Sequence, residues 1–379
     1  MRKILYITTV SRTVNAFLVP HIHMLLDKGV QVDCACCIDK EIDSSLIERG
    51  VKVFDIPFSR NPLSSNNFNA YKVLKEIQRK NQYDWIHVHT PIAGLYGRLL
   101  KVSFPQLRTI YTAHGFHFHQ GGSKVGWLVY YPIERLMAYF TDILITINNE
   151  DYKRALGFKA KKVFKINGVG IDPQEYNVSN FNRDELKKQY GLDKDDFVIA
   201  MIAEVNINKN HKQMIEAVKI LNKQGIHVKV LCAGEGNLLN EIIDEVKVQG
   251  LNQQIKMLGF SQNIKEIIAI SDIGLLLSYR EGLPRSVMEL MCFKKPVIGT
   301  NIRGNRDLIS HGETGYLVEV GDYQQTAEHI KRLFSNKELV KDLGEKAAER
   351  MNSFAIDKVL SQLGEIIFQE DLNGAEIKD

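Results

Sequence analysis

The segment Ser278–Val318, SYREGLPRSVMELMCFKKPVIGTNIRGNRDLISHGETGYLV, decides which fold this chain adopts. An apolar run ends just before it at Leu277, a loop with the sequence EGLP follows at 281–284, and helical spacing begins near Arg285. Proline is favoured in the first turn of a helix, where free backbone N–H groups attract anions. Because ligands of open α/β sheets bind beyond the carboxyl ends of the strands, the segment predicts a strand, a ligand-binding loop and a helix.

Two carboxylates flank the start of that helix. Glu281 lies in the loop and Glu289 lies inside the helix. One carboxylate can therefore reach a group at the mouth of the loop, while the other reaches a neighbouring hydroxyl-rich group. Two glutamates at this spacing also occur by chance, one in a loop and one on a solvated helix face. On spacing alone, chance is the stronger explanation.

Outward from this segment, short apolar runs alternate with amphipathic stretches, a pattern typical of parallel βαβ units in doubly wound sheets. Strands are predicted at residues 3–8, 31–36, 52–56, 85–88, 109–112, 143–147, 162–166, 197–202, 228–233, 255–258, 273–277 and 296–299. Helices are predicted at residues 15–28, 69–80, 183–190, 212–223, 238–248, 264–270, 286–293 and 326–335. The periodicity fades after residue 170, so we expect domains at 1–170 and 196–354, a linker at 171–195, and a tail at about 355–379 that packs back on the first domain.

The composition is that of an ordinary globular protein. The 379 residues are 44% hydrophobic and 25% charged, which argues against a disordered, collagen-like or coiled-coil chain. No apolar run approaches the roughly 18 residues of a membrane span, and the apolar start of the chain is too short for a signal peptide. Three of the five cysteines crowd residues 34–37 and an odd number leaves one unpaired, so a disulfide framework is not expected and a reducing cytoplasm fits better than an oxidising compartment.

Charge is spread unevenly along the chain. Residues 1–170 hold 23 Lys and Arg against 13 Asp and Glu, whereas residues 171–379 hold 26 against 32. This asymmetry indicates two domains with different partners, and an anionic lipid surface, a phosphate-bearing acceptor or nucleic acid would each suit the basic half. Nucleic acid is the weakest of the three, because no basic block is interleaved with aromatic residues.

The combined motifs resemble retaining glycosyltransferases of family 4. The resemblance rests on Glu281-x7-Glu289, on KPVI at 295–298 and on GETGYLV at 312–318. A subgroup that acts in capsular and exopolysaccharide assembly shares three further patterns, which are DWIHVHTPIAGLYGR at 84–98, YTAHGF at 111–116 and NIRGNRD at 301–307. The resemblance covers most of the chain and is more specific for the family than for the substrate.

The resemblance implies the GT-B fold, in which two Rossmann-like doubly wound domains face each other across a cleft. The second domain would bind a nucleotide-sugar, by family habit a UDP-sugar, and the basic first domain would bind a polyprenyl-diphosphate-linked or other saccharide acceptor. A hexosyl or N-acetylhexosaminyl group would be transferred with retention of configuration and without a metal or other cofactor. Such an enzyme would be cytoplasmic, peripheral on the inner face of the cell membrane, and would bind no nucleic acid.

The resemblance also assigns roles to particular residues. Glu281 would contact the donor sugar, Lys209 the diphosphate and His114 the reacting sugar, and these three are the predicted catalytic residues. A lysine at the diphosphate would neutralise charge that develops on the leaving group, while Glu289 would accept hydrogen bonds from ribose hydroxyls. The other predicted donor contacts are Gly282, Leu283, Pro284, Arg285, Gly259, Phe260 and Gly234, and the acceptor-side candidates are Ser11, His89 and His117.

Two positions depart from the family pattern. Glu204 stands where the family usually has an arginine, and a carboxylate there would repel phosphate unless it is paired. Our hypothesis is that Arg285 or Arg306 replaces the missing cation. The first strand ends in TTVSR at 8–12 instead of the Gly-Gly turn of many relatives, which leaves the acceptor contacts of that loop open.

Several motifs have competing interpretations. Five of the eleven histidines fall within residues 87–119, and a His-x-His strand could hold a metal, although polar lining of the sugar or acceptor site explains them better. The DKD at 193–195 matches a DxD metal motif but indicates a solvated turn. Gly234-Glu235-Gly236 suits either a close phosphate approach or a tight strand-to-helix turn. His211 and His227 are expected at the surface or a helix edge.

The aromatic segment 121–140, GGSKVGWLVYYPIERLMAYF, has two equally good explanations. Its rings beside Lys124 and Arg135 suit a membrane interface, and a helix packed on the first sheet would suit the same pattern. Two rival functions also stay open. A nucleotide-sugar 2-epimerase of the same fold would need carboxylates that the Glu281-x7-Glu289 segment does not provide, and a catalytically silent polysaccharide-assembly partner is supported by Glu204 alone.

Overall fold

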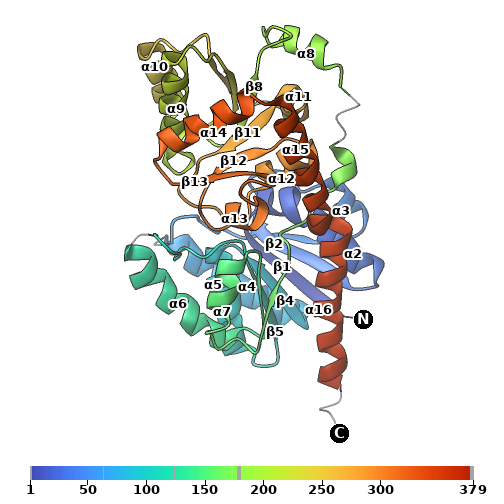
Figure 1. Cartoon of the computed structure of the whole chain (residues 1–379). Coiled ribbons are helices and arrows are strands. Elements are labelled where there is room, and N and C mark those ends of the chain that lie inside the picture. The colour runs from blue at the N-terminus through green and yellow to red at the C-terminus, as the bar shows by residue number, and fades with distance from the viewer. Residues whose placement is uncertain (1, 63, 123, 177–180, 376–379) are drawn as a thin grey trace. The chain divides into compact units, whose positions relative to one another are not determined.

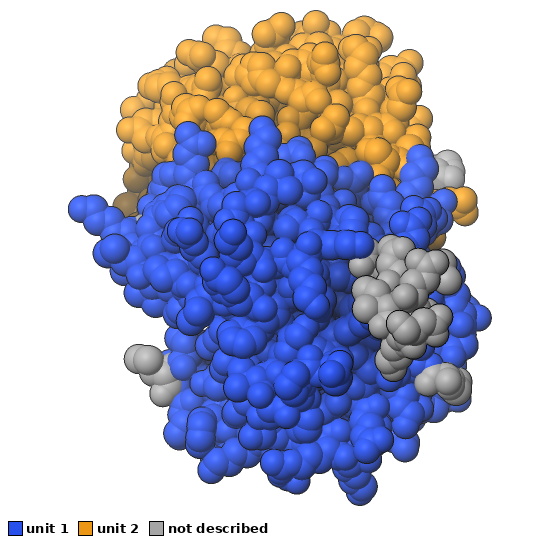
Figure 2. Space-filling view, turned by 90° about the horizontal axis from the view of Figure 1, so that it is seen from below, with its two compact units in different colours: residues 1–170, 356–379 blue, residues 171–355 orange. Residues whose placement is uncertain are grey.

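The chain forms two compact units in the computed structural model, which describes residues 2–62, 64–122, 124–176 and 181–375. The first unit comprises residues 1–170 and 356–379, and the second comprises residues 171–355. Figure 2 distinguishes the two units by colour. Each unit is built on its own parallel sheet, so each is described by itself.

The first unit contains a seven-stranded sheet with the order β3-β2-β1-β4-β5-β6-β7, in which all paired strands are parallel (Figure 1). Its strands are β1 (Lys3–Val10), β2 (Gln31–Cys37), β3 (Val53–Asp55), β4 (Trp85–His89), β5 (Arg108–Ala113), β6 (Ile143–Thr146) and β7 (Lys162–Lys165). Its helical segments are α1 (Ser11–Thr13), η1 (Val14–Leu18), α2 (Val19–Asp27), α3 (Ser44–Glu48), α4 (Ser65–Asn81), α5 (Pro91–Ser103), η2 (Gly126–Tyr130), α6 (Tyr131–Met137), η3 (Ala138–Phe140), α7 (Asn149–Ala155) and α16 (Ile356–Ala375).

The C-terminal helix α16 belongs to the first unit although it follows the second in the chain. It packs against α2, and the Lys28 ammonium lies 4.9 Å from the centre of the Phe368 ring. Val359, Leu363 and Ile367 are buried at four-residue spacing on one face of α16, as an amphipathic helix requires. This apolar face anchors the end of the chain on the unit that contains its beginning.

The second unit contains a six-stranded parallel sheet with the order β10-β9-β8-β11-β12-β13. Its strands are β8 (Val198–Ile202), β9 (Lys229–Ala233), β10 (Ile255–Gly259), β11 (Ile273–Leu276), β12 (Val297–Thr300) and β13 (Gly315–Val318). Its helical segments are η4 (Pro173–Glu175), α8 (Arg183–Gln189), η6 (Ile207–Lys209), α9 (His211–Lys223), α10 (Leu239–Val248), α11 (Ile264–Ile270), α12 (Arg285–Cys292), α13 (Asn305–Leu308), α14 (Tyr323–Phe334), α15 (Lys337–Met351) and η7 (Asn352–Phe354).

The burial of the central strands explains why continuous apolar runs in the sequence predict strands of this fold. All four residues of β11 and of β12 are buried, because helices cover both faces of a parallel sheet and leave no polar face to alternate with. The expected doubly wound α/β architecture is confirmed in both units.

Helix α5 is one of the elements that the sequence analysis missed. It contains Gly94 and Gly97, which disfavour a helix in isolation. Both are needed for close packing, since a Cβ at Gly94 would lie 2.9 Å from the Tyr111 ring and one at Gly97 would lie 2.5 Å from Val88. Tertiary packing therefore overrides local propensity. The analysis also missed α3, α7, α13, α15 and β13.

The prediction that His211 lies at the surface or a helix edge is wrong. The side chain is 2% exposed at the start of α9, and burial lowers the pKa of its ring to about 4. His227 is exposed, as expected. The polarity of a histidine hid a core position that the helical pattern of α9 would otherwise have indicated.

Strand order reverses at the first strand of each sheet. In the first unit β1 lies between β2 and β4, and in the second unit β8 lies between β9 and β11. Loops that leave neighbouring strands in opposite directions open a crevice at the carboxyl edge, where open α/β sheets bind their ligands. Ser11 and His89 of the first unit, and Lys209 and Glu281 of the second, lie at or after the carboxyl ends of these central strands.

Candidate active site

A lysine and a glutamate meet at the switch point of the second sheet. Lys209 follows β8 and Glu281 follows β11, and Lys209 Nζ donates a hydrogen bond to Glu281 Oε1 at 2.6 Å. Their side chains are only 19% and 12% exposed. The two predicted catalytic residues of this unit are therefore brought together as a shielded ion pair.

Hydrogen bonds between the two loops fix this pair. Asn206 caps the short helix η6, where its side chain accepts a hydrogen bond from Lys209 N at 3.1 Å. Asn208 then joins the loops, since its O accepts from Tyr279 N at 2.8 Å and its Nδ2 donates to Arg280 O at 3.1 Å. The lysine and the glutamate thus sit on one connected backbone network.

A cation that the sequence analysis missed supports the Glu281 loop. Arg303 is 4% exposed, and its Nε donates to Glu281 O at 3.0 Å. Gly304 has φ +78°, and a Cβ there would lie 2.6 Å from Gly282 O. Only glycine permits this close approach. The NIRGNRD motif contains both residues, and its contacts with the loop could not be read from sequence spacing.

Glu289 lies on α12 and is held by two neighbouring side chains, one of them on the same helix. Its Oε1 accepts hydrogen bonds from Tyr176 Oη and from Arg285 Nε, both at 3.1 Å. Burial, together with the nearby Glu289 carboxylate, raises the pKa of Tyr176 to about 12. The phenol therefore remains a donor at neutral pH, and it orients a carboxylate whose other lone pairs can accept further hydrogen bonds.

The Gly234-Glu235-Gly236 turn packs directly on the chain after β8. A Cβ at Gly234 would lie 1.9 Å from Ala203 O, and one at Gly236 would lie 2.1 Å from Val205 O. A tight turn therefore accounts for both glycines. Gly234 N donates to Gly259 O at 2.8 Å, which places the predicted base-contacting turn beside it. Phe260, in that turn, is 66% exposed.

Glu204 lies exposed between these loops. Neither arginine of our replacement hypothesis is paired with it. Arg285 contacts Glu289, and Arg306 Nη1 donates to Asn301 O at 2.9 Å. The replacement hypothesis therefore stays a prediction, and Arg303 is a further cation beside Glu281.

The first unit has a cavity of about 260 Å³ at its own switch point. Thr9 and Thr90 line it from the ends of β1 and β4, and their hydroxyl oxygens lie 2.6 Å apart. Thr90 has φ +65° and ψ 150°, a conformation that costs on the order of 1–3 kcal/mol outside glycine. Such strain is typical of functional loops. His117 also lines the cavity and stacks on Tyr130 with ring centres 4.6 Å apart.

The other two acceptor-side candidates do not line this cavity. Ser11 is fully buried, and its Oγ lies 2.9 Å from Asp39 Oδ1 and 2.7 Å from Lys40 O. His89 is also buried, with its Nδ1 2.9 Å from His114 Nε2. The structure thus places only His117 on the cavity.

His114 is half-buried and lies against a cluster of buried rings formed by His21, His87 and His89. Burial lowers the pKa of His114 to about 4, so its ring is neutral at pH 7. Within the described ranges, no group of three or more His, Cys, Asp or Glu side chains has metal-binding geometry. Residues 193–195 are exposed, as expected of a solvated turn.

The aromatic segment after residue 123 is partly buried and partly exposed. Glu134 forms a 2.8 Å ion pair with Arg98, and both side chains are buried. By contrast, Val125, Leu128, Leu136 and Tyr139 are 60–75% exposed. Among the described helices, none combines the length and the hydropathy that a bilayer crossing requires.

Both halves of the chain match known family models. Residues 182–350 match the model described as glycosyl transferases group 1, and residues 3–148 match the model described as glycosyl transferase 4-like. The chain is 33% identical over 370 residues to "Putative glycosyltransferase EpsD" of Bacillus subtilis, and the match covers 96% of each chain.

Two further relatives are informative. UDP-Gal:alpha-D-GlcNAc-diphosphoundecaprenol alpha-1,3-galactosyltransferase of Escherichia coli is 26% identical over 300 residues, which cover 77% of each chain. The crystal structure of Anabaena Alr3699/HepE in complex with UDP and glucose has a TM-score of 0.81 and 20% identity, and it covers 97% of this chain and 100% of that one. This last likeness shows that the two chains share the GT-B fold.

Proposed function

This chain belongs to the family 4-like, group 1 glycosyltransferases, and we propose that it transfers a sugar from a UDP-sugar to a lipid-linked saccharide with retention of configuration. The acceptor class assigns it to the assembly of a capsular or other extracellular polysaccharide. The observation that carries the proposal is the Lys209–Glu281 ion pair at the switch point of the second sheet.

The second unit supplies the chemistry that a nucleotide-sugar needs. The ammonium group of Lys209 would stabilise the leaving diphosphate, because cleavage of the sugar–phosphate bond leaves an additional negative charge on that group. Glu281, released from the lysine, can accept hydrogen bonds from sugar hydroxyls. Glu289 can accept from the ribose, since Tyr176 and Arg285 occupy only one of its oxygens in the contacts described above.

Retention is proposed to follow from front-face displacement. The leaving phosphate would take the proton of the acceptor hydroxyl as the new glycosidic bond forms and the sugar–phosphate bond breaks. This step needs no protein nucleophile, and the lysine provides the charge stabilisation for which other enzymes recruit a metal ion. We therefore propose that the reaction is metal-independent, with His114 as the remaining predicted catalytic residue.

Two observations support a uridine nucleotide and a lipid-linked acceptor. The Escherichia coli relative uses UDP-Gal and an undecaprenyl diphosphate acceptor, as its name states. The first half of this chain carries ten more Lys and Arg than Asp and Glu, which suits a diphosphate-bearing lipid at an anionic surface. The acceptor is assigned to the cavity lined by Thr9, Thr90 and His117.

We also propose that the exposed apolar side chains of η2 and α6 rest on the cytoplasmic membrane surface. Leu128 and Leu136 are 75% and 61% exposed, and Lys124 and Arg135 are exposed beside them. Apolar side chains flanked by cations bind anionic bilayers without crossing them. A lipid-linked substrate requires such a contact.

A transfer assay tests the proposal. Purified protein would be incubated with UDP-sugars and a polyprenyl-diphosphate-linked saccharide, and the product anomer would be assigned by NMR against the donor. Acceptor-dependent transfer with retention, lost in Glu281→Ala, is expected. Conversion of the UDP-sugar without an acceptor would support the epimerase instead. No transfer with any donor would move support to the assembly partner.

A further inference from the structure

A cavity that the proposed reaction does not use lies at the opposite edge of the second sheet. It has a volume of about 590 Å³, within the range of small-molecule sites. Phe197, Asp272 and Lys295, which precede β8, β11 and β12, line it. Lys209 and Glu281 follow the carboxyl ends of β8 and β11, so the sheet itself separates the two sites.

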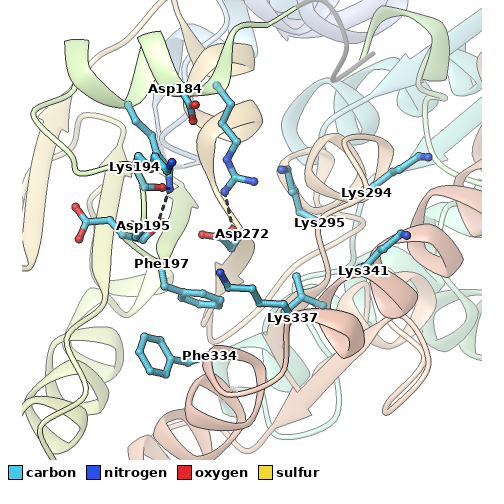
Figure 3. Close-up of a pocket in the computed structure, with 14 residues that line it drawn as sticks. Asp184, Lys194, Asp195, Phe197, Asp272, Lys294, Lys295, Phe334, Lys337 and Lys341 are labelled. Carbon is cyan, nitrogen blue, oxygen red and sulfur yellow. Dashed lines mark hydrogen bonds and ion pairs between the residues drawn. The ribbon is translucent and has the colours of Figure 1, made fainter.

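Cations outnumber acids in the lining of this cavity. Seven Lys and Arg residues line it against four Asp, whereas the whole unit 171–355 holds 24 Lys and Arg against 26 Asp and Glu. The excess of positive charge is therefore local. Figure 3 shows Asp184 and Asp195 on one side of the cavity and Lys294 and Lys341 on the other.

Two of these cations are buried, and their hydrogen bonds within the described part of the chain are to carbonyl groups. Lys187 Nζ donates to Lys194 O at 2.8 Å and to Asp196 O at 2.7 Å. Lys295 Nζ donates to Ala269 O at 3.2 Å and to Ser271 O at 2.7 Å. Burial lowers the pKa of Lys295 to about 7. The nearby carboxylate of Asp272 is already paired with Arg183 at 2.5 Å, so an anion in the cavity would further favour the charged form of both lysines.

Three exposed lysines stand at positions that helix and backbone stability disfavour. Lys337 is the first residue of α15, where the helix dipole opposes a cation, and Lys341 is four residues later on the same face. Lys294 has φ +57°, in the left-handed region that favours glycine. Across the described ranges, none of these three ammonium groups contacts a carboxylate. These three lysines do not stabilise the fold through ion pairs, whereas an anionic ligand would give their ammonium groups a partner.

The remaining lining is rigid and partly aromatic. A Cβ at Gly344 would lie 2.1 Å from Lys294 O, so α15 packs directly on the turn that carries this lysine. The rings of Phe197 and Phe334 meet edge to face with centres 5.6 Å apart. Figure 3 shows Lys337 extending toward these rings. The cavity therefore offers cations beside an apolar surface.

We propose that this cavity is a second anion site, which binds a nucleotide-sized molecule with two or more phosphate groups. The phosphates would lie among Lys294, Lys337 and Lys341, and an apolar or aromatic part would lie on Phe197 and Phe334. Because the sheet separates this site from the donor site, such a ligand would not compete with the donor.

Calorimetric titration of the full chain tests this site with inorganic triphosphate and with ATP as probes. Lys337→Ala/Lys341→Ala should weaken triphosphate binding about tenfold or more, because each charge-assisted phosphate contact contributes substantially. A matched control, Lys223→Ala/Lys358→Ala, removes two exposed lysines outside the cavity and should bind like wild type. Lys209→Ala should also bind like wild type, which separates this site from the donor site.

Each other outcome overturns the proposal. Absence of triphosphate binding, or equal weakening in the control variant, would mean that the lysines form no site. Loss of binding in Lys209→Ala would mean that triphosphate enters the donor site. ATP is expected to bind more tightly than triphosphate, and equal affinity would exclude the aromatic surface. If the protein bound only phosphatidylglycerol vesicles, and Lys337→Ala/Lys341→Ala lost this binding, the ligand of the site would be a lipid headgroup and not a soluble polyphosphate.

Discussion

Lys209 Nζ and Glu281 Oε1 lie 2.6 Å apart across the switch point of the second sheet, although 72 residues separate them in sequence. In this state each group satisfies the other. In the proposed reaction a donor diphosphate would draw the lysine away, and the sugar hydroxyls would then replace it at the glutamate. The pair would thus couple recognition of the diphosphate and the sugar of the donor.

This coupling predicts non-additive losses of activity. Glu281→Gln and Lys209→Ala should each lower the transfer rate at saturating donor by about 10²–10³-fold, as expected for groups that stabilise developing charge. The double variant should be little worse than the poorer single variant, because residues that act as a unit share one contribution. Losses that multiply would show that the two residues act independently.

Ribose recognition by Glu289 can be tested with a substrate analogue. Wild-type protein should bind UDP about tenfold more tightly than 2′-deoxy-UDP, because a hydrogen bond to a charged group contributes about 1.5–3 kcal/mol. Glu289→Ala should bind both nucleotides equally. Ser286→Ala, on the same helix, serves as the control. If Glu289→Ala still bound UDP more tightly than 2′-deoxy-UDP, Glu289 would not be the residue that recognises the ribose.

Much of this site followed from the sequence, but its connections did not. The strand ends that carry Lys209 and Glu281 were predictable, because apolar runs mark buried parallel strands. The pairing of Lys209 with Glu281 was not predictable, because their loops are neighbours only through the adjacent positions of β8 and β11 in the sheet. Arg303 was also missed as a support of Glu281, because its contact is to a backbone oxygen.

The same limit applies to helices and to the core. Gly94 and Gly97 conceal α5, because their value lies in contacts with Tyr111 and Val88 that no local pattern encodes. His211 is a core residue for a similar reason. A polar side chain such as that of His211 is expected at the surface, but its position in the packed fold can bury it.

The buried Arg98–Glu134 pair predicts a large effect on stability. Glu134→Ala should lower the free energy of unfolding of the first unit by about 3–5 kcal/mol, because it leaves the arginine charge buried and unpaired. Both tryptophans, Trp85 and Trp127, lie in this unit, so urea unfolding followed by tryptophan fluorescence reports on it.

Two further variants make the measurement of this pair specific. Replacing both members of the pair by Met and Leu should restore most of the stability, because no charge then remains buried. Glu76→Ala removes an exposed partner of Arg79 and should cost less than about 1 kcal/mol. Similar losses for Glu134→Ala and Glu76→Ala would contradict the importance of burial.

Buried histidines predict that the fold is sensitive to acid. Burial lowers the pKa of His114 to about 4 and also lowers the pKa values of His21, His87 and His89 below 6.5. Below pH 6.5 the unfolded chain therefore binds more protons than the folded chain, and the free energy of unfolding falls as the pH decreases toward 4. Above pH 6.5 these rings contribute no pH dependence.

Urea unfolding of the first unit between pH 7.5 and 4.5 measures this slope. His114→Gln should make the decline shallower, whereas His227→Gln changes an exposed ring in the other unit and should leave it unchanged. A free energy of unfolding that stays constant from pH 6.5 to 4.5 would show that these rings accept protons in the folded state.

Membrane contact can be separated from catalysis. Leu128→Ser/Leu136→Ser should lower the partition of the protein onto phosphatidylglycerol vesicles by about tenfold or more, because each leucine buries apolar surface in the bilayer interface. Turnover of a short, water-soluble acceptor should not change. Val248→Ser, at an exposed apolar residue of the other unit, is the control. Unchanged vesicle binding in the double variant would assign the contact to another surface.

The proposed donor site is tested most directly by a nucleotide titration of wild-type protein and Lys209→Ala, carried out in EDTA. Wild-type protein should bind UDP in preference to GDP, ADP and CMP without a divalent metal, and Lys209→Ala should lose most of this affinity. A ligand at 100 times its Kd would also add about 2.7 kcal/mol of stability. Wild-type protein that binds no nucleotide, or Lys209→Ala that binds UDP as tightly as wild type, would contradict the proposed donor site.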